Sequence, residues 1–143
     1  MKVKQLSIFL ENQSGRLAEV TGALGEEEIN IRALSLADTS GFGILRLIVS
    51  DLAKARQVLQ GKGFTVRETD VIAVQIPDHP GGLAGILAIL GAKGINIEYM
   101  YAFVQKCAQN AVVIFRIEDV DQAIATLQAG GVHILAAQDV YAL

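Results

Sequence analysis

The sequence is poor in the residues that disulfides and metal sites require. Its 143 residues include one cysteine, two histidines, two prolines and no tryptophan. A single Cys107 excludes an internal disulfide framework, and the scattered His79 and His133 form no metal-ligand cluster. We therefore expect no metal and no cofactor. We expect Cys107 to be an inert, small apolar residue, and the chain to work in a reducing cytoplasm.

Basic charge and long apolar runs are also scarce. The formal net charge is −3, whereas nucleic-acid binders usually carry a basic face. Residues 1–4 lead into an alternating strand pattern and not into the apolar core of a signal peptide. The most apolar window, "GGLAGILAILGA" (81–92), is too short to span a bilayer. Neither nucleic acid nor a membrane is therefore an expected partner.

The chain contains an internal repeat, in which two copies of one sequence pattern follow each other. Residues 11–34, "ENQSGRLAEVTGALGEEEINIRAL", align without a gap with residues 77–100, "PDHPGGLAGILAILGAKGINIEYM". After a two-residue insertion, "SDLAKARQVLQGKGFTV" (50–66) aligns with "EDVDQAIATLQAGGVHI" (118–134). The same glycine and the same Ile-Asn-Ile recur at the same spacing. We predict two domains, residues 1–70 and residues 71–143.

Each copy has the pattern strand, helix, strand, strand, helix, strand. Alternating or continuous apolar segments predict strands at 4–10, 29–38, 42–50, 64–69, 71–76, 95–104, 110–117 and 132–138. Leucines at helical spacing predict first helices, and Asp51 and Asp119 suit the N-caps of second helices. Gly41 and Gly43 suit a turn. This order is the ferredoxin-like βαββαβ motif, an α+β fold with helices on one face of an antiparallel sheet.

Three further expectations follow from the pattern. The run "FTVRETDVIAVQI" (64–76) leaves almost no linker, so the copies should form a rigid pseudo-dimer. The helix at 83–90 is apolar nearly all round, which predicts burial on all sides in a contact between domains or subunits. The tail "DVYAL" (139–143) echoes residues 70–74 and could extend the last strand across a sheet edge.

The polar loops before the two first helices are the candidate binding sites. Free N–H groups at a helix N-terminus attract a carboxylate, and glycine lets a ligand approach the backbone. Asn side chains both donate and accept hydrogen bonds, which suits an amino-acid zwitterion. The candidate ligand-binding residues are Asn12, Gln13, Ser14, Gly15, Arg16, Leu17, Asn30 and Ile31, and in the second copy Asp78, His79, Gly81, Gly82, Leu83, Asn96 and Ile97.

A purely structural interpretation of these residues stays open. Glycine before a helix often serves only a turn, and Ser14 could be only an N-cap. An Asn before a strand often tolerates left-handed geometry. His79 and Arg16 could contact a ligand or simply lie in solvent. Because both copies need the same turn, the recurrence does not decide between the interpretations.

The segment "LENQSGRLAEVTGALGEEEINIRALSL" (10–36) resembles an ACT domain, a small ligand-sensing module of amino-acid metabolism. Both copies match its pattern of a strand, a polar loop ending in glycine and an apolar residue, a helix and "NI" opening the next strand. The resemblance therefore covers essentially the whole chain. The first copy also resembles the N-terminal half of acetolactate synthase regulatory subunits.

The resemblance implies which residues hold a ligand. Serine-sensing ACT domains of the phosphoglycerate dehydrogenase type use two asparagines, which match Asn12 and Asn30 in the first copy. The second copy has Asp78 and Asn96, so the first copy is the better candidate. Those domains also use a histidine where this chain has Leu10, a departure that puts serine itself in doubt.

The resemblance also implies a function. We expect a regulatory protein, a homodimer, that binds a free amino acid at an interface between ACT domains. The alternative is a regulatory subunit of a separate enzyme of amino-acid biosynthesis, similar to the acetolactate synthase small subunit. An enzyme is not expected, because neither copy places a nucleophile beside a base.

Overall fold

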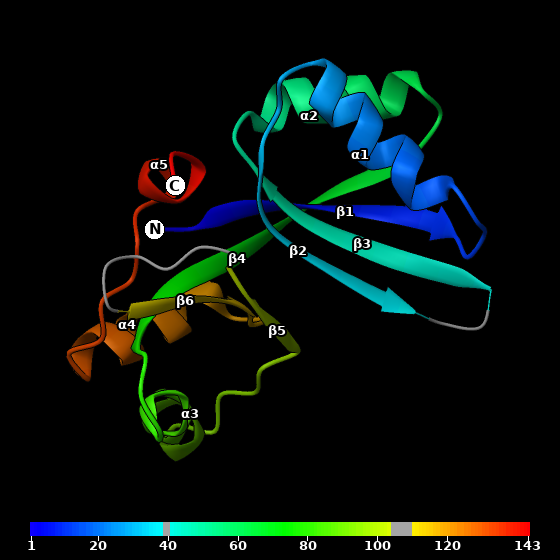
Figure 1. The fold of residues 1–143 in the computed structure, drawn as a ribbon. Coiled ribbons are helices and arrows are strands. Elements are labelled where there is room, and N and C mark those ends of the chain that lie inside the picture. Colours follow the sequence, from blue (N-terminus) through cyan, green and yellow to red (C-terminus); the bar gives the residue numbers. More distant parts are fainter. Residues whose placement is uncertain (39–40, 104–109) are drawn as a thin grey trace. The chain divides into compact units, whose positions relative to one another are not determined.

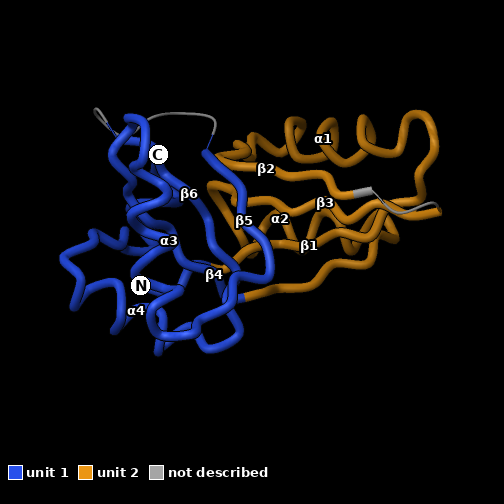
Figure 2. The backbone as a smooth tube through the Cα atoms, turned by 90° about the horizontal axis from the view of Figure 1, so that it is seen from below, with its two compact units in different colours: residues 1–3, 70–143 blue, residues 4–69 orange. Residues whose placement is uncertain are grey.

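The computed structural model describes residues 1–38, 41–103 and 110–143. The chain divides into two compact units, which Figure 2 shows in orange and blue. Following the order of the chain, we call residues 4–69 the first unit, which is orange and labelled unit 2 in Figure 2. We call residues 70–143 together with residues 1–3 the second unit, which is blue and labelled unit 1 there.

The first unit is an antiparallel sheet with two helices (Figure 1). Its elements are β1 (Val3–Glu11), α1 (Arg16–Glu26), β2 (Ile31–Asp38), β3 (Phe42–Val49), α2 (Leu52–Gly61) and the first part of β4 (Thr65–Pro77). The strand order is β2-β3-β1-β4, with β3 antiparallel to both β1 and β2. Alternate residues of β1 and β3, such as Leu6 and Leu47, join Val20 and Leu59 of the helices in one buried core.

The second unit repeats this plan with a shorter sheet. Its elements are the rest of β4, α3 (Gly82–Ala92), β5 (Tyr99–Ala102), β6 (Asn110–Arg116), α4 (Val120–Ala129) and α5 (Ala137–Tyr141). The strand order is β4-β6-β5, and both pairs are antiparallel. Ile72, Phe115, Leu90 and Leu127 are among the residues of its core.

Most of the predicted elements are confirmed. The α+β class and the βαββαβ-like order with antiparallel sheets are observed. Asp51 caps α2 by accepting a hydrogen bond from the Lys54 N–H at 3.1 Å, and Asp119 caps α4 by accepting one from the Gln122 N–H at 3.1 Å. The two strand segments within residues 64–76 form the single strand β4.

The predicted closing strand of the second copy, residues 132–138, is reduced to a short antiparallel pairing with β4. Ile134 forms a bridge to Val74, the Gln75 N–H donates to the His133 carbonyl and the Leu135 N–H donates to the Ala73 carbonyl. The tail does not extend a strand, because Asp139–Tyr141 belong to α5. The physical reason lies in the alanine-containing segment "AAQDVYA" (136–142), since alanine and glutamine favour a helix over a strand.

Two other expectations need correction. The strand predicted at 95–104 begins only at Tyr99, because the Ile95 N–H donates back to the Leu90 carbonyl at the end of α3. The strand predicted at 29–38 begins at Ile31 for the same reason. Val104 and Cys107 lie outside the described residues.

The first helix of the second copy, α3, is not buried on all sides. Its residues Gly82, Ile86 and Leu90 are buried, whereas Ala84 and Ala88 are exposed. Small apolar residues raise the hydropathy of the helix without requiring a buried face. A contact of this face with another subunit stays a prediction. In the described part of the chain, no helix is both long enough and apolar enough to cross a membrane.

Candidate ligand pocket at the first strand–helix loop

The loop between β1 and α1 is shaped by backbone hydrogen bonds. The Gln13 N–H donates to the Glu11 carbonyl at 2.8 Å, and the Arg16 N–H donates to the Gln13 carbonyl at 3.4 Å. Gly15 is the N-cap residue of α1 and has φ 90°, a left-handed conformation that favours glycine. The glycine therefore lets the chain turn sharply from the strand into the helix.

The N-cap residue of α1 is Gly15, and among the described residues no side-chain cap hydrogen bond is made at this helix N-terminus. Ser14 is therefore not an N-cap, which removes one of the structural interpretations of the loop. The first N–H groups of an α-helix have no acceptor within the helix. The Leu17 and Ala18 N–H groups stand at these positions, with the positive end of the helix dipole beside them.

The second loop has the same backbone pattern. The His79 N–H donates to the Pro77 carbonyl at 2.9 Å, and the Gly82 N–H donates to the His79 carbonyl at 3.0 Å. Gly81 is the N-cap of α3, has φ 86° and receives no side-chain cap. The two copies thus build equivalent loops, as their alignment implies.

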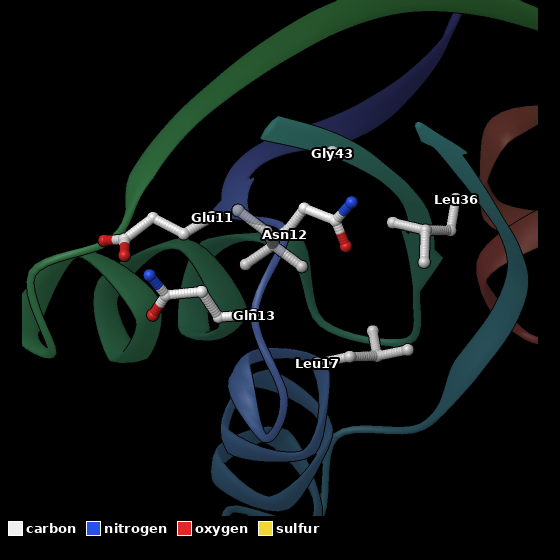
Figure 3. A pocket seen from close by; sticks show the side chains of 7 residues that line it. Glu11, Asn12, Gln13, Leu17, Leu36 and Gly43 are labelled. Carbon is white, nitrogen blue, oxygen red and sulfur yellow. The ribbon is translucent and has the colours of Figure 1, made fainter. Parts of the chain in front are cut away.

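A cavity of about 170 Å³ lies beside the first loop. It is lined by Leu10, Glu11, Asn12, Gln13, Leu17, Leu36 and Gly43, which come from β1, the loop, α1, β2 and β3. Figure 3 shows the Asn12 amide pointing between Gly43 and Leu36, with Leu17 below it. The cavity therefore combines a polar amide and a helix N-terminus with aliphatic walls.

Arg16 takes part in a different set of contacts. Its guanidinium pairs with Glu19 at 2.9 Å and with Glu11 at 3.4 Å, and it lies over the ring of Phe64 at 5.3 Å from the centroid. These contacts tie the end of β1 to the first turn of α1. The charge of Arg16 is thus shared by two carboxylates, and the residue supports the loop from outside the cavity lining.

The structure does not bring Asn30 to the loop of its own unit. Asn30 precedes β2 and forms two hydrogen bonds with Ser50. The Asn30 N–H donates to the Ser50 Oγ at 2.9 Å, and the Ser50 N–H donates to the Asn30 carbonyl at 2.9 Å. β1 and β2 are both antiparallel to β3, so Asn30 and Asn12 lie at opposite ends of the sheet. An eight-residue strand spans about 25 Å, too far for one amino acid to touch both. The next residue, Ile31, packs against the core.

The candidate residues of the second copy lie in several places. His79, Gly81 and Gly82 line a cavity of about 490 Å³ that also includes His133 and Gly130. Asn96 lines another cavity, of about 330 Å³, near the start of α4. Leu83 and Ile97 pack against the core of the second unit, and Asp78 is exposed. These residues are not gathered around one pocket.

Sequence reasoning missed four residues of the first cavity, Leu10, Glu11, Leu36 and Gly43. Gly43 lies in β3, as the strand predicted at 42–50 implies and not in a turn, and it pairs with Leu10 of β1. Antiparallel pairing of the first and third strands would have placed these two residues together. Among the described residues, no group of three or more histidine, cysteine, aspartate or glutamate side chains could hold a metal ion.

The fold and the loops define a class, the tandem of ferredoxin-like βαββαβ units. Residues 1–143 match the family described as an ACT domain pair, and the chain belongs to that family. A search of curated proteins found no match.

Solved structures share this fold. Protein BT0572 from Bacteroides thetaiotaomicron is 48% identical, with a TM-score of 0.94 over 100% of this chain and 98% of that one. The regulatory subunit of aspartate kinase from Thermus thermophilus, in a ligand-free form, is 17% identical. The match has a TM-score of 0.62 and covers 88% of this chain and 90% of that one. The corresponding subunit from Thermus flavus is 18% identical, with a TM-score of 0.60 over 90% and 92%. These two subunits show likeness of fold.

Proposed function

We propose that this chain is a non-catalytic regulatory protein that senses a free amino acid through the cavity beside the β1–α1 loop. The observation that carries the proposal is the cavity itself, in which Asn12 and the uncapped N-terminus of α1 lie beside aliphatic walls. The membership in the ACT domain pair family fits a regulatory, amino-acid-sensing role.

The proposed chemistry assigns a part of the ligand to each group. The α-carboxylate accepts hydrogen bonds from the Leu17 and Ala18 N–H groups, where the helix dipole favours a negative charge. The Asn12 carbonyl oxygen accepts from the α-ammonium group, since an amide offers both donors and an acceptor. The ligand side chain then turns towards Leu17 and Leu36.

A second copy of the chain would complete the site. Because Asn30 lies far from Asn12 in the same unit, an Asn30 that touches the ligand must come from another ACT module. A homodimer would supply it, and the ligand would then bind between ACT domains. Such a ligand shifts the assembly only by its difference in affinity for the two states.

A thermal-shift screen of the purified chain against the twenty standard amino acids tests the proposal. A ligand present at 100 times its dissociation constant should add about 2.7 kcal/mol of stability. We expect one amino acid or one chemical class to raise the melting temperature. If no amino acid raises it, the sensing function is refuted.

The alternative is a regulatory subunit whose main role is to bind a separate enzyme of amino-acid biosynthesis. The Thermus relatives bear names of this kind, as regulatory subunits of aspartate kinase. Affinity purification of the tagged chain from its own cells distinguishes the two. Recovery of a large catalytic subunit together with an absence of amino-acid binding would favour the alternative.

A further inference from the structure

Three leucines, Leu10, Leu17 and Leu36, form the aliphatic part of the cavity wall beside the first loop. Leu10 forms the inner wall and is 4% exposed, whereas Leu17 and Leu36 are 37% and 51% exposed at the opening. Among the described residues that line the cavity there is no lysine or arginine, and the one carboxylate among them, Glu11, is paired with Arg16. Two exposed leucines that face one cavity leave apolar area for a ligand to cover.

We infer that the cavity selects an amino acid with a branched aliphatic side chain, of the valine, leucine and isoleucine class. This inference rests on the proposed function and adds the identity of the ligand. Burying an aliphatic side chain against Leu10, Leu17 and Leu36 removes apolar surface from water on both partners. A polar or charged side chain packed against these three leucines would lose its hydration, and the leucine side chains offer it no hydrogen bond.

Gly43 sets the width of the cavity at the wall formed by β2 and β3. A Cβ on Gly43 would lie 3.2 Å from Leu36 Cδ1 and 3.5 Å from the Ala37 carbonyl oxygen. Leu36 would have to move, and its side chain already borders the cavity. A methyl group at residue 43 therefore narrows the space for the ligand side chain.

The second unit has neither a leucine equivalent to Leu36 nor a glycine equivalent to Gly43. Strand pairing places Ile76 opposite Ala111, as it places Leu10 opposite Gly43. It also places Ala102 opposite Val113, at the position that Leu36 occupies in the first unit. Alanines thus replace Leu36 and Gly43, whereas the equivalents of Leu10 and Leu17 stay aliphatic, as Ile76 and Leu83. We infer that aliphatic selection belongs to the first unit alone, with one such site per chain.

Isothermal titration calorimetry of the purified full-length chain provides the test. The ligands are valine, leucine and isoleucine, compared with serine, aspartate, lysine and phenylalanine. We expect heat of binding from the aliphatic group, with about one site per chain. One methylene in an apolar pocket changes discrimination by about tenfold or more, so Gly43→Ala should weaken leucine binding about tenfold and valine binding less.

Two further variants test the cavity wall and provide a matched control. Leu36→Ala removes the outer wall, and we expect it to weaken all three aliphatic ligands. Ala111→Gly is the matched control, because it changes the equivalent position of the second unit and should leave every affinity unchanged. Circular dichroism of each variant confirms that the fold is retained.

The outcomes separate the two proposals. If a polar, charged or aromatic amino acid binds and the aliphatic ones do not, the selection is refuted while amino-acid sensing stands. Equal affinities of Gly43→Ala and the parent chain for leucine would also overturn the selection. If none of the twenty amino acids binds, both proposals fail together.

Discussion

Gly82 lies so close to Pro77 that a Cβ on Gly82 would overlap the Pro77 carbonyl oxygen. Gly82 is buried at the start of α3, directly after the turn glycine of the second loop. The equivalent position in the first loop holds Arg16, whose long side chain fits there. The end of β4 therefore approaches its helix more closely than the end of β1 approaches α1.

This contact predicts that Gly82→Ala destabilises the second unit. The added methyl group meets backbone, which cannot move aside as a flexible side chain can. We expect a loss of about 2 kcal/mol or more in the free energy of unfolding, as is typical of overpacking. The measurement is urea denaturation followed by circular dichroism.

Gly85→Ala in the same helix is the control for this substitution. A Cβ on Gly85 would meet nothing within 4 Å, and the residue is exposed. Alanine favours a helix over glycine by about 1 kcal/mol, so this variant should be as stable as the parent chain or more stable. Equal effects of the two substitutions would refute the proposed overlap.

The order of elements could be predicted because periodicity and capping act locally. Asp51 and Asp119 stand just before helical patterns, and both cap their helices as expected. The end of the second copy could not be predicted by alignment with the first. Residues 132 and 134 are apolar like residues 64 and 66 of the first copy, but in the second copy the chain then continues into α5, whose Val140 is buried. The helix propensity of residues 137–141 therefore outweighed the strand that alignment with the first copy predicts there.

The two N-caps predict a matched pair of effects. Asp51→Ala and Asp119→Ala each remove the acceptor of one helix N–H group, and each should cost about 1 kcal/mol of stability. Asp51→Asn and Asp119→Asn keep an acceptor oxygen and should cost much less. Thermal melts of the four variants measure this. Equal losses for alanine and asparagine would contradict the capping role and indicate a role of charge.

The contacts of Arg16 predict that it contributes to the free energy of unfolding and does not bind the ligand directly. Arg16→Ala removes two ion pairs and the contact with Phe64, and we expect a loss of about 1 kcal/mol, smaller at high salt. Glu19→Gln is the control, because it removes the shorter ion pair and leaves the Phe64 contact. We expect a loss of less than about 0.5 kcal/mol for it. Melts at low and high sodium chloride measure both. A larger loss for Glu19→Gln would contradict the contribution of Phe64.

The candidate pocket could be predicted only in part. The loop residues Asn12 and Gln13 are consecutive in sequence, so a motif reveals them. Leu36 and Gly43 reach the same cavity through the pairing of β2, β3 and β1, and that register follows from the folded sheet. Arg16 follows the loop glycine at a position from which the motif predicts ligand contact, but its guanidinium forms ion pairs with Glu11 and Glu19.

The difference between the two loops gives the most direct prediction for the site. Asn12 lines the cavity of the first unit, whereas the equivalent Asp78 lies in a loop whose neighbours line a different cavity. Asn12→Ala should raise the dissociation constant of the amino acid about tenfold or more, because it removes a hydrogen-bonding partner of a charged group. Asp78→Ala should leave the dissociation constant unchanged.

Asn12→Asp is the sharper variant, because it gives the first loop the residue of the second. A carboxylate at residue 12 lies beside the proposed position of the ligand's own carboxylate, and like charges repel. We expect binding to weaken at least as much as in Asn12→Ala. Titration calorimetry of the three variants with the amino acid found in the thermal-shift screen measures these changes. If Asp78→Ala alone abolishes binding, the amino acid binds in the second unit and not beside Asn12.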